Sequence, residues 1–214
     1  MNKQKGNMYE FCSHTWNAIK GKCSHDCSYC YMKIFPQGEL RLDEKEFKTD
    51  LGTGNTIFVG SSTDMFADNV PIEWIERVLE YCRKFDNTYI FQTKNPERFK
   101  EFENFFPDKT IFGTTIETNK ATLLAKYSEA PINRFYIRNF KRKFVTIEPI
   151  MDFDLVDFIK MIKIVEPEFV NIGADSKNSN LIEPDGKKIK ELIESLSKFT
   201  EVRIKDNLKR LLKN

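Results

Sequence analysis

The sequence has neither a long apolar run nor an excess of charge of one sign. No segment approaches the ~18 consecutive apolar residues that mark a membrane-spanning helix. The first five residues hold no apolar core of the kind found in secretory signals. The 34 basic side chains are nearly balanced by 32 acidic ones, so net charge gives no broad nucleic-acid or membrane signature. We therefore expect a soluble, cytoplasmic protein.

Cysteine is scarce, and its count is odd. Five cysteines occur in 214 residues, and three of them fall in one short segment. This distribution disfavours a secreted disulfide framework and favours a reducing compartment. With 40% hydrophobic and 31% charged residues, the composition is that of a globular domain, and the 19 phenylalanines are expected to help fill its core.

The segment 23–30 places three thiols at the spacing C-x-x-x-C-x-x-C, on Cys23, Cys27 and Cys30. Thiolates are soft ligands that select iron–sulfur clusters, zinc or Cu(I). Three thiolates from one loop can hold three corners of a four-iron cubane and leave the fourth iron without a nearby protein ligand. A chemically active metal site needs such an open position, whereas a structural site normally closes it.

Two other interpretations of the same thiols stay open. A zinc site would combine them with His25, which lies between the first two cysteines. Zinc modules usually add a second ligand pair some distance away, but Cys12, His14 and Cys82 form no such pair. The third interpretation is an inert, buried set of cysteines. Packing in the core is the role expected of Cys82, which lies on the apolar face of a predicted helix.

Short apolar segments alternate with amphipathic ones along the chain, which predicts alternating strands and helices. The predicted strands are 14–20, 56–60, 88–92, 110–115, 143–147 and 169–172, with 201–204 as a last edge strand. The predicted helices are a short one within 31–50, then 71–85, 96–106, a short one from about Asn119, 155–165, 187–199 and a basic piece over 207–214, while 131–142 is less regular. Asp68 or Asn69 is expected to cap the helix at Pro71, and Asp154 the helix that follows it.

This alternation implies right-handed βαβ units and a parallel sheet. Six or seven units are too few for a full eight-fold barrel, so we expect an α/β fold of the partial, open (βα)6 TIM-barrel type. One domain is expected over 1–214, with the barrel core at 12–200 and the last edge strand and basic helix at 201–214.

Active sites of such barrels lie at the carboxyl ends of the strands. The residues at those positions are unusually polar for neighbours of buried strands, which makes them candidate site residues. They are Ser61, Ser62, Thr63, Thr93, Lys94, Thr115, Glu117, Glu148, Asn171, Gly173 and Asp175. The alternative is that some of them simply cap the helices that follow.

The cysteine spacing, with Tyr29 before the last cysteine, resembles the signature of the radical S-adenosylmethionine (radical SAM) enzymes. Further motifs look like those of one family of small, poorly characterised radical SAM proteins, common in phage and bacterial genomes and distantly similar to spore photoproduct lyase. These motifs are Thr15-Trp16-Asn17, the segments 61–66 and 93–98, Glu148-Pro149 and the turn at Gly173. The resemblance extends from about Cys12 to Leu211.

The resemblance implies a role for each matching position. Cys23, Cys27 and Cys30 would ligate a 4Fe–4S cluster, and Tyr29 would lie near the adenine of SAM. The segment 61–63 would contact the SAM amino group, although it lacks the Gly-Gly-Glu run that is frequent in the superfamily. The carboxylate and ribose of SAM would be contacted by Lys94, Thr115 and Glu117, and further cofactor contacts would come from Glu148, Asn171 and Gly173. Ala174 and Asp175 depart from the glycine and glutamate that are frequent in the family.

The implied function is reductive cleavage of SAM to a 5′-deoxyadenosyl radical, which abstracts hydrogen from an unidentified substrate. Flavodoxin or ferredoxin would supply the electron. Cys12, near the cluster loop, is a candidate hydrogen-atom donor or auxiliary metal ligand. The stretch 133–143 interleaves basic and aromatic residues, which suits a nucleic acid or nucleotide, but a solvated basic surface over packed phenylalanines explains it as well. The tail adds Arg203, Lys205, Lys209 and Arg210. A non-catalytic, zinc-containing nucleic-acid-binding module is the alternative function.

Overall fold

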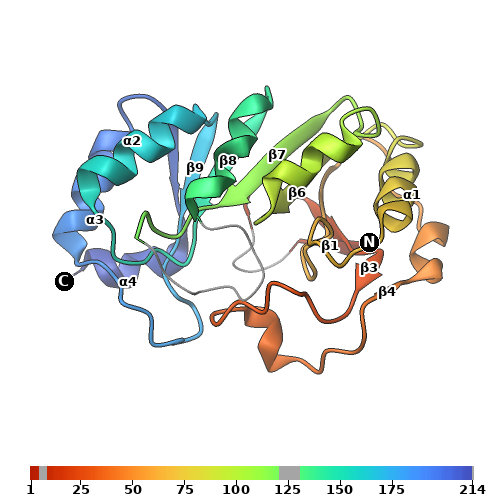
Figure 1. The fold of residues 1–214 in the computed structure, drawn as a ribbon, viewed down its shortest axis with the longest axis horizontal. Coiled ribbons are helices and arrows are strands. Elements are labelled where there is room, and N and C mark those ends of the chain that lie inside the picture. Colours follow the sequence, from red (N-terminus) through yellow and green to blue (C-terminus); the bar gives the residue numbers. More distant parts are fainter. Residues whose placement is uncertain (5–8, 121–130, 214) are drawn as a thin grey trace.

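A computed structural model describes residues 1–4, 9–120 and 131–213 as an open, mostly parallel barrel (Figure 1). Its eight-stranded sheet has the order β1-β2-β5-β6-β7-β8-β9-β10, and every pair except β1–β2 is parallel. The strands are β1 (Asn2–Lys3), β2 (His14–Trp16), β5 (Thr56–Val59), β6 (Thr88–Thr93), β7 (Thr110–Thr115), β8 (Lys143–Ile147), β9 (Phe169–Ile172) and β10 (Glu201–Ile204). The predicted partial barrel is confirmed, including β10 as an edge strand.

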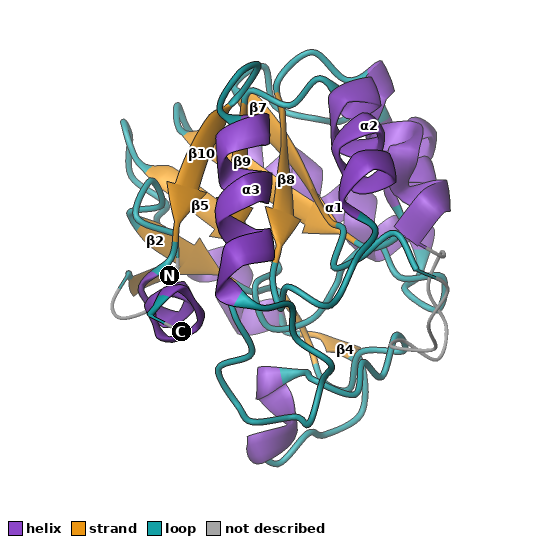
Figure 2. Ribbon diagram, turned by 90° about the vertical axis from the view of Figure 1, so that its left-hand side faces the viewer, coloured by secondary structure: helices purple, strands orange, loops and turns teal. Residues whose placement is uncertain are grey.

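The α-helices are α1 (Ile72–Cys82), α2 (Leu155–Val165), α3 (Gly186–Leu196) and α4 (Lys209–Leu212). Five 3₁₀ segments complete the helical structure of the described residues: η1 (Tyr31–Ile34), η2 (Glu44–Lys48), η3 (Pro96–Phe102), η4 (Pro131–Asn139) and η5 (Asp206–Leu208). Figure 2 shows α3 against the outer face of the sheet near β8 and β9. No helix of the described residues is both long and apolar enough to span a membrane.

The alternation of side chains along each strand separates an outer core from a barrel interior. On β5, for example, Ile57 and Val59 join the outer cluster beneath α1, while Phe58 points into the interior. The interior cluster also holds Tyr9 and Cys12, which come from the segment before β2. Aromatic side chains therefore fill the interior of the barrel, and polar groups lie toward the carboxyl ends of the strands.

The extent of the first strand is a correction to the sequence prediction of 14–20. β2 ends at Trp16, and β3 (Ile19–Lys20) instead pairs antiparallel with β4 (Arg41–Leu42) in a separate two-stranded ribbon. The chain leaves the sheet at Asn17, whose side chain bonds the serines that follow β5. This turn carries the orange segment of Figure 1 across the carboxyl ends of the strands.

The predicted helix caps at Asp68 and Asn69 are also wrong. The residue before α1 is Pro71, and the Asp68 carboxylate instead accepts a hydrogen bond of 2.7 Å from Asn95. Asp154 does precede α2, but its side chain makes no capping hydrogen bond. α1 ends at Cys82, three residues before Phe85.

Other helix predictions differ in form or fall outside the described residues. The helix predicted at 96–106 is a 3₁₀ segment, η3, which ends at Phe102. Phe99 and Phe102, predicted on one face of that helix, are both buried. The short helix expected from about Asn119 falls largely on residues 121–130, outside the described part of the chain.

Candidate functional site

A cavity of about 530 Å³ lies at the carboxyl ends of the barrel strands. This volume is within the range of small-molecule and cofactor sites. One wall is the cysteine loop, and the others are the ends of β5, β6, β7 and β8 with the turn after β9. The lining includes the predicted residues Cys23, Cys27, Tyr29, Cys30, Ser61, Ser62, Thr63, Thr93, Lys94, Thr115, Glu148 and Asp175.

The three thiols of the loop all face this cavity, and all are free. Asp26 adopts a left-handed conformation with φ 46°, which turns the loop between the first two cysteines. Burial raises the pKa of Cys23 to about 11 and also raises the pKa of Cys27, on which the charge of Lys94 acts in the opposite direction. Among the described residues, no three His, Cys, Asp or Glu side chains form a ready-made site for a single metal ion.

A three-thiol donor set suits a group that takes one thiolate per metal atom. In a four-iron cubane each of three irons binds its own cysteine, so the sulfurs need not converge on a single point. The thiols also lie beside Lys94, whose side chain is 16% exposed at the cavity wall. The soft donors, their shared cavity and the adjacent cation fit a cluster with a small, carboxylate-bearing cofactor beside it.

Tyr29 fixes the loop to the barrel through a buried carboxylate. Its hydroxyl donates to Glu117, which also accepts a 2.7 Å bond from Arg134 Nη1 and lies 3.8 Å from Lys94 Nζ. Burial alone would raise the pKa of Glu117, but Arg134 and Lys94 lower it below its ordinary value. Glu117 is fully buried and stands behind Tyr29, outside the cavity lining.

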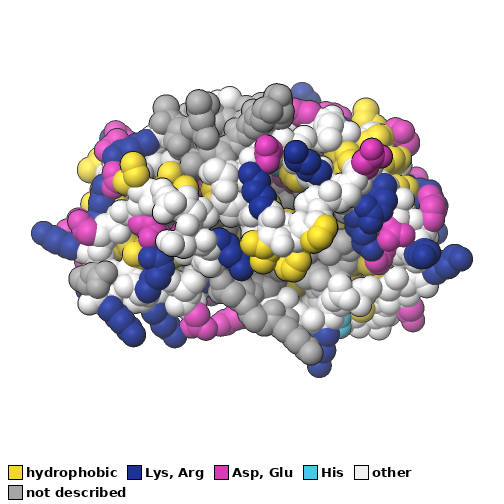
Figure 3. Space-filling view, turned by 90° about the horizontal axis from the view of Figure 1, so that it is seen from below, with side chains coloured by type: hydrophobic (Ala, Val, Ile, Leu, Met, Phe, Trp, Pro, Cys, Tyr) yellow, Lys and Arg dark blue, Asp and Glu magenta, His cyan; other side chains and the backbone are white. Residues whose placement is uncertain are grey.

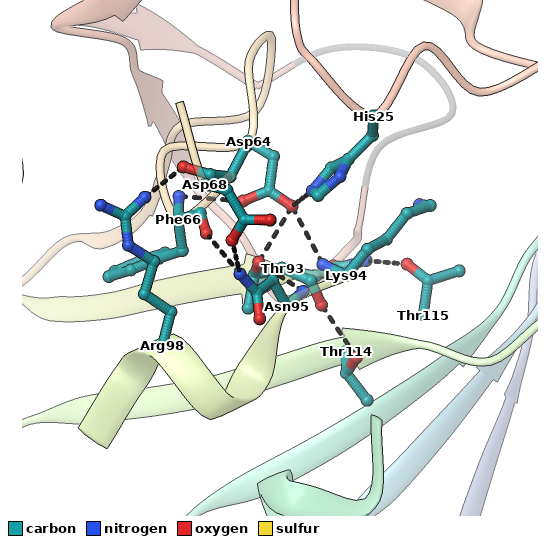
Figure 4. Close-up of polar contacts among 12 residues, drawn as sticks. His25, Asp64, Phe66, Asp68, Thr93, Lys94, Asn95, Arg98, Thr114 and Thr115 are labelled. Atoms are coloured by element: carbon teal, nitrogen blue, oxygen red, sulfur yellow. Dashed lines mark hydrogen bonds and ion pairs between the residues drawn. The ribbon is translucent and has the colours of Figure 1, made fainter. Parts of the chain in front are cut away.

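A second anchor joins the loop to β5 and β6 (Figure 4). His25 reaches down from the loop, and its Nε2 lies 2.8 Å from Asp64 Oδ2. The same carboxylate accepts bonds of 2.9 Å from the Thr93 hydroxyl and the Lys94 backbone N–H. Burial would raise the pKa of Asp64, but His25 and the backbone N–H groups of Lys94 and Phe66 lower it. Asp64 thus holds loop and strand ends together, a role that the sequence analysis does not assign.

The position of Glu148, which follows β8, depends on Gly173, which follows β9. Glu148 pairs with Lys205 at 2.6 Å and accepts a 2.8 Å bond from Asn207. A Cβ atom on Gly173 would lie 2.6 Å from Glu148 Oε1, so only glycine lets the carboxylate occupy this place. Gly173 therefore supports the cavity wall that Glu148 forms.

The serines after β5 are held mainly by bonds within the chain. Ser61 exchanges hydrogen bonds of 3.2 Å with Asn17, and the Ser62 backbone N–H donates to Asn17 Oδ1. The Thr63 hydroxyl donates to Gly21 O at 2.8 Å. These contacts place the segment on the cavity wall and tie it to the turn that follows β2.

Cys12 and Asn171, two predicted residues, do not line this cavity. Cys12 is buried in the barrel interior, its Sγ donates to His14 O at 2.8 Å, and burial raises its pKa. Asn171 lines a second, adjacent cavity. Tyr9, which the sequence analysis does not single out, lines both cavities. The pair of aromatics at Tyr9 and Phe11, just before β2, is the signal that points to it.

The basic–aromatic stretch 133–143 forms much of η4 and is partly internal. Arg134 binds Glu117, Lys143 donates to Phe140 O, and the Phe140 ring packs on Phe112 at 4.3 Å. Arg138, Lys141 and Arg142 are exposed. On the face of the molecule seen in Figure 3, Lys and Arg side chains lie among Asp and Glu side chains.

Comparison with known proteins adds a family. The model of DUF5131, described as a protein family of unknown function, matches residues 37–180, more than half of the chain. The chain belongs to this family. The matched residues begin after the cysteine loop, so the assignment does not bear on the thiols. No curated protein matches.

Solved structures of spore photoproduct lyase share the fold of this DUF5131 protein. A mutant with bound AdoMet and dinucleoside spore photoproduct superposes with a TM-score of 0.66 at 10% identity, covering 94% of this chain and 78% of that one. A cysteine-to-serine mutant gives 0.64 at 11% identity with the same coverage. At such identities the likeness establishes the fold.

Proposed function

We propose that this protein is a radical SAM enzyme. Cys23, Cys27 and Cys30 hold a 4Fe–4S cluster, and S-adenosylmethionine binds beside it in the cavity at the strand ends. The observation that carries the proposal is that three thiols from one loop face a cavity of about 530 Å³ at the carboxyl ends of a partial parallel barrel. The fold shared with a lyase solved with bound AdoMet supports it.

When bound, the cluster and SAM supply reductive carbon–sulfur cleavage and hydrogen abstraction from a substrate, with flavodoxin or ferredoxin as the proposed electron source. The side chains of the protein bind the cofactor and orient the groups around it. Lys94 offers a cation to the carboxylate of SAM, and charge-assisted bonds of this kind are short and strong. Glu117 and Arg134 orient Tyr29, and the aromatic interior beneath the cavity excludes water from the reaction.

A single zinc ion, the alternative, would need its ligands to converge on one point, and among the described residues no three His, Cys, Asp or Glu side chains do so. His25 is 2% exposed and bonds Asp64 through Nε2, so it serves the contact between loop and strands. Asp64 in turn accepts from Thr93 and Lys94, which ties the histidine into a structural network.

A nucleotide or nucleic acid is the substrate class that we propose for the enzyme. Structures of spore photoproduct lyase contain a dinucleoside spore photoproduct. The exposed Arg138, Lys141 and Arg142 on and beside η4 offer cations for phosphate groups.

The test is anaerobic reconstitution with iron and sulfide, then reduction by dithionite in the presence of SAM and chromatography for 5′-deoxyadenosine. We expect deoxyadenosine above a no-enzyme control, and its loss in Cys27→Ala. Cys82→Ala is the matched control, because Cys82 is buried in α1 outside the cavity lining. Absence of cluster absorbance, with stoichiometric zinc in the isolated protein, would overturn the proposal.

A further inference from the structure

A second cavity, of about 980 Å³, lies directly beside the first. Tyr9 and Lys205 line both cavities and form the partition between them. The Tyr9 hydroxyl donates to Gln92 Oε1 at 2.6 Å and lies 2.9 Å from the Thr146 hydroxyl. The other walls of the second cavity are Phe11, Asn171 and the end of β10.

Asn171 is the unusual residue of this cavity. It is 3% exposed, and its Nδ2 has no hydrogen-bond partner within the described part of the chain. In register it lies between Thr146 of β8 and Arg203 of β10, so its side chain shares their face of the sheet. Leaving a buried amide donor unpaired is costly, and an apolar side chain of similar size would avoid the cost. A hydrogen-bond acceptor on a bound ligand would also remove this cost.

The wall beside Asn171 is flat. The Arg203 guanidinium carbon lies 3.6 Å from the ring centroid of Phe169 and 5.0 Å from that of Phe11. Glu201 holds the same guanidinium through two hydrogen bonds, of 2.8 and 3.0 Å. A stacked and immobilised surface of this kind suits a planar ring.

Four of the five charged side chains that line the second cavity are held in ion pairs, and the fifth, Glu10, is exposed. Arg203 binds Glu201, and Asp206 binds Lys209 at 2.7 Å. The cation on the partition, Lys205, is held by Glu148 at 2.6 Å. A polyanionic ligand would have to break these pairs, whereas a neutral one leaves them intact.

We propose that the second cavity binds a neutral, planar heterocycle that carries a ring carbonyl, and that Asn171 donates its amide hydrogen bond to that carbonyl. The inference rests on the proposed function in one respect: it assigns this heterocycle to the part of the substrate that lies behind Tyr9, away from the reacting group. The ring lies against Phe11 and Arg203, and the remainder of the molecule passes the partition into the first cavity.

The test compares inosine with adenosine, which differ by a carbonyl in place of an amino group on the same ring. Binding to the full-length, reconstituted protein is measured by ligand-observed NMR and titration calorimetry. We expect inosine to bind about tenfold more tightly than adenosine, the discrimination of one well-formed hydrogen bond. Asn171→Leu removes the donor at similar volume, and we expect it to abolish the preference. A hexamer of inosine nucleotides then distinguishes a free nucleoside from a base within a nucleic-acid strand. If the hexamer binds more than six times as tightly as inosine, the gain exceeds the number of bases, and the site is assigned to a base within a strand.

The stability of Asn171→Leu separates a ligand role from a structural one. Because the amide has no partner within the described chain, we expect an unchanged or higher melting temperature together with the lost preference. A lower melting temperature, or an inosine preference that survives the substitution, would overturn the inference. The assay detects neither SAM cleavage nor cluster integrity, so deoxyadenosine formation can fail while this binding stands, and the reverse.

Discussion

Tyr29 and Glu117, which are 88 residues apart in the sequence, are joined by a partly buried hydrogen bond. This bond connects the thiol-bearing loop to the residue that follows β7. Arg134 binds the same carboxylate from a third segment. The position of the thiols therefore depends on an ion pair that lies outside the cavity wall.

Glu117→Gln should destabilise the fold strongly. The neutral amide removes the Glu117 charge that pairs with the buried Arg134, which costs about 3 kcal/mol in the free energy of unfolding. Urea denaturation measures the loss. Glu97→Gln is the control, since Glu97 is exposed and should change stability by less than about 0.5 kcal/mol. Equal stability of the two variants would contradict a structural role for the Glu117 charge.

Tyr29→Phe should loosen the loop while keeping its aromatic ring. The lost bond to a carboxylate is worth about 1.5 to 3 kcal/mol. We expect less iron and sulfide bound per chain after reconstitution than in the parent protein. Tyr136→Phe is the comparison, because Tyr136 lies on η4 outside both cavities. Full iron content in Tyr29→Phe would show that the hydroxyl does not position the loop.

Asp64→Asn should increase hydrogen exchange of the backbone amides in residues 23–30. The substitution weakens the contacts with His25, Thr93 and the Lys94 N–H at once. Mass spectrometry of the exchanged peptides gives the measurement. As a control, Asp86→Asn removes an exposed partner of Lys109 and should leave that peptide unchanged. Unaltered exchange in Asp64→Asn would refute the anchoring role.

Gly173→Ala should displace Glu148 from Lys205 and Asn207. The new Cβ would lie 2.6 Å from Glu148 Oε1. Overpacking of this kind costs about 1 to 3 kcal/mol. Gly38→Ala is the matched control, because its nearest neighbour is the flexible end of Arg41 at 3.3 Å. Thermal unfolding of both variants tests the prediction. Equal melting temperatures of Gly173→Ala and Gly38→Ala would contradict it.

Asp152 should stabilise the fold at neutral pH and lose that effect in acid. Hydrogen bonds from Lys120 and Lys188 lower its pKa from 3.8 to about 2. A lowered folded-state pKa means that the stabilisation is complete above the unfolded pKa and disappears as the pH falls through about 2. After allowance for solvent screening, Asp152→Asn should cost about 1 kcal/mol at pH 7. Urea titrations of both proteins between pH 2 and 7 test this, and a pH-independent difference would contradict it.

Local sequence patterns were sufficient for the strands and for most of the polar strand ends. Each of β5 to β9 coincides closely with an apolar, β-rich segment, because the inner strands of a parallel sheet are buried on both faces. The same reasoning failed at 14–20, where Asn17 diverts the chain into a second sheet. It also failed at Asp68, whose partner Asn95 comes from another strand end. Capping preferences describe neighbouring residues and contain no information on such distant partners.

The amino-acid sequence by itself determined the three-thiol loop, the alternation of strands and helices, and the polar character of the strand ends, because these follow from residue type, spacing and periodicity. Only the tertiary structure decided which polar groups face the cavity. It placed Glu117 behind Tyr29, joined His25 to Asp64, filled the barrel with Tyr9 and left the Asn171 amide beside a second cavity. Each of these outcomes depends on segments that are far apart in the chain and meet only when the sheet curves into a barrel.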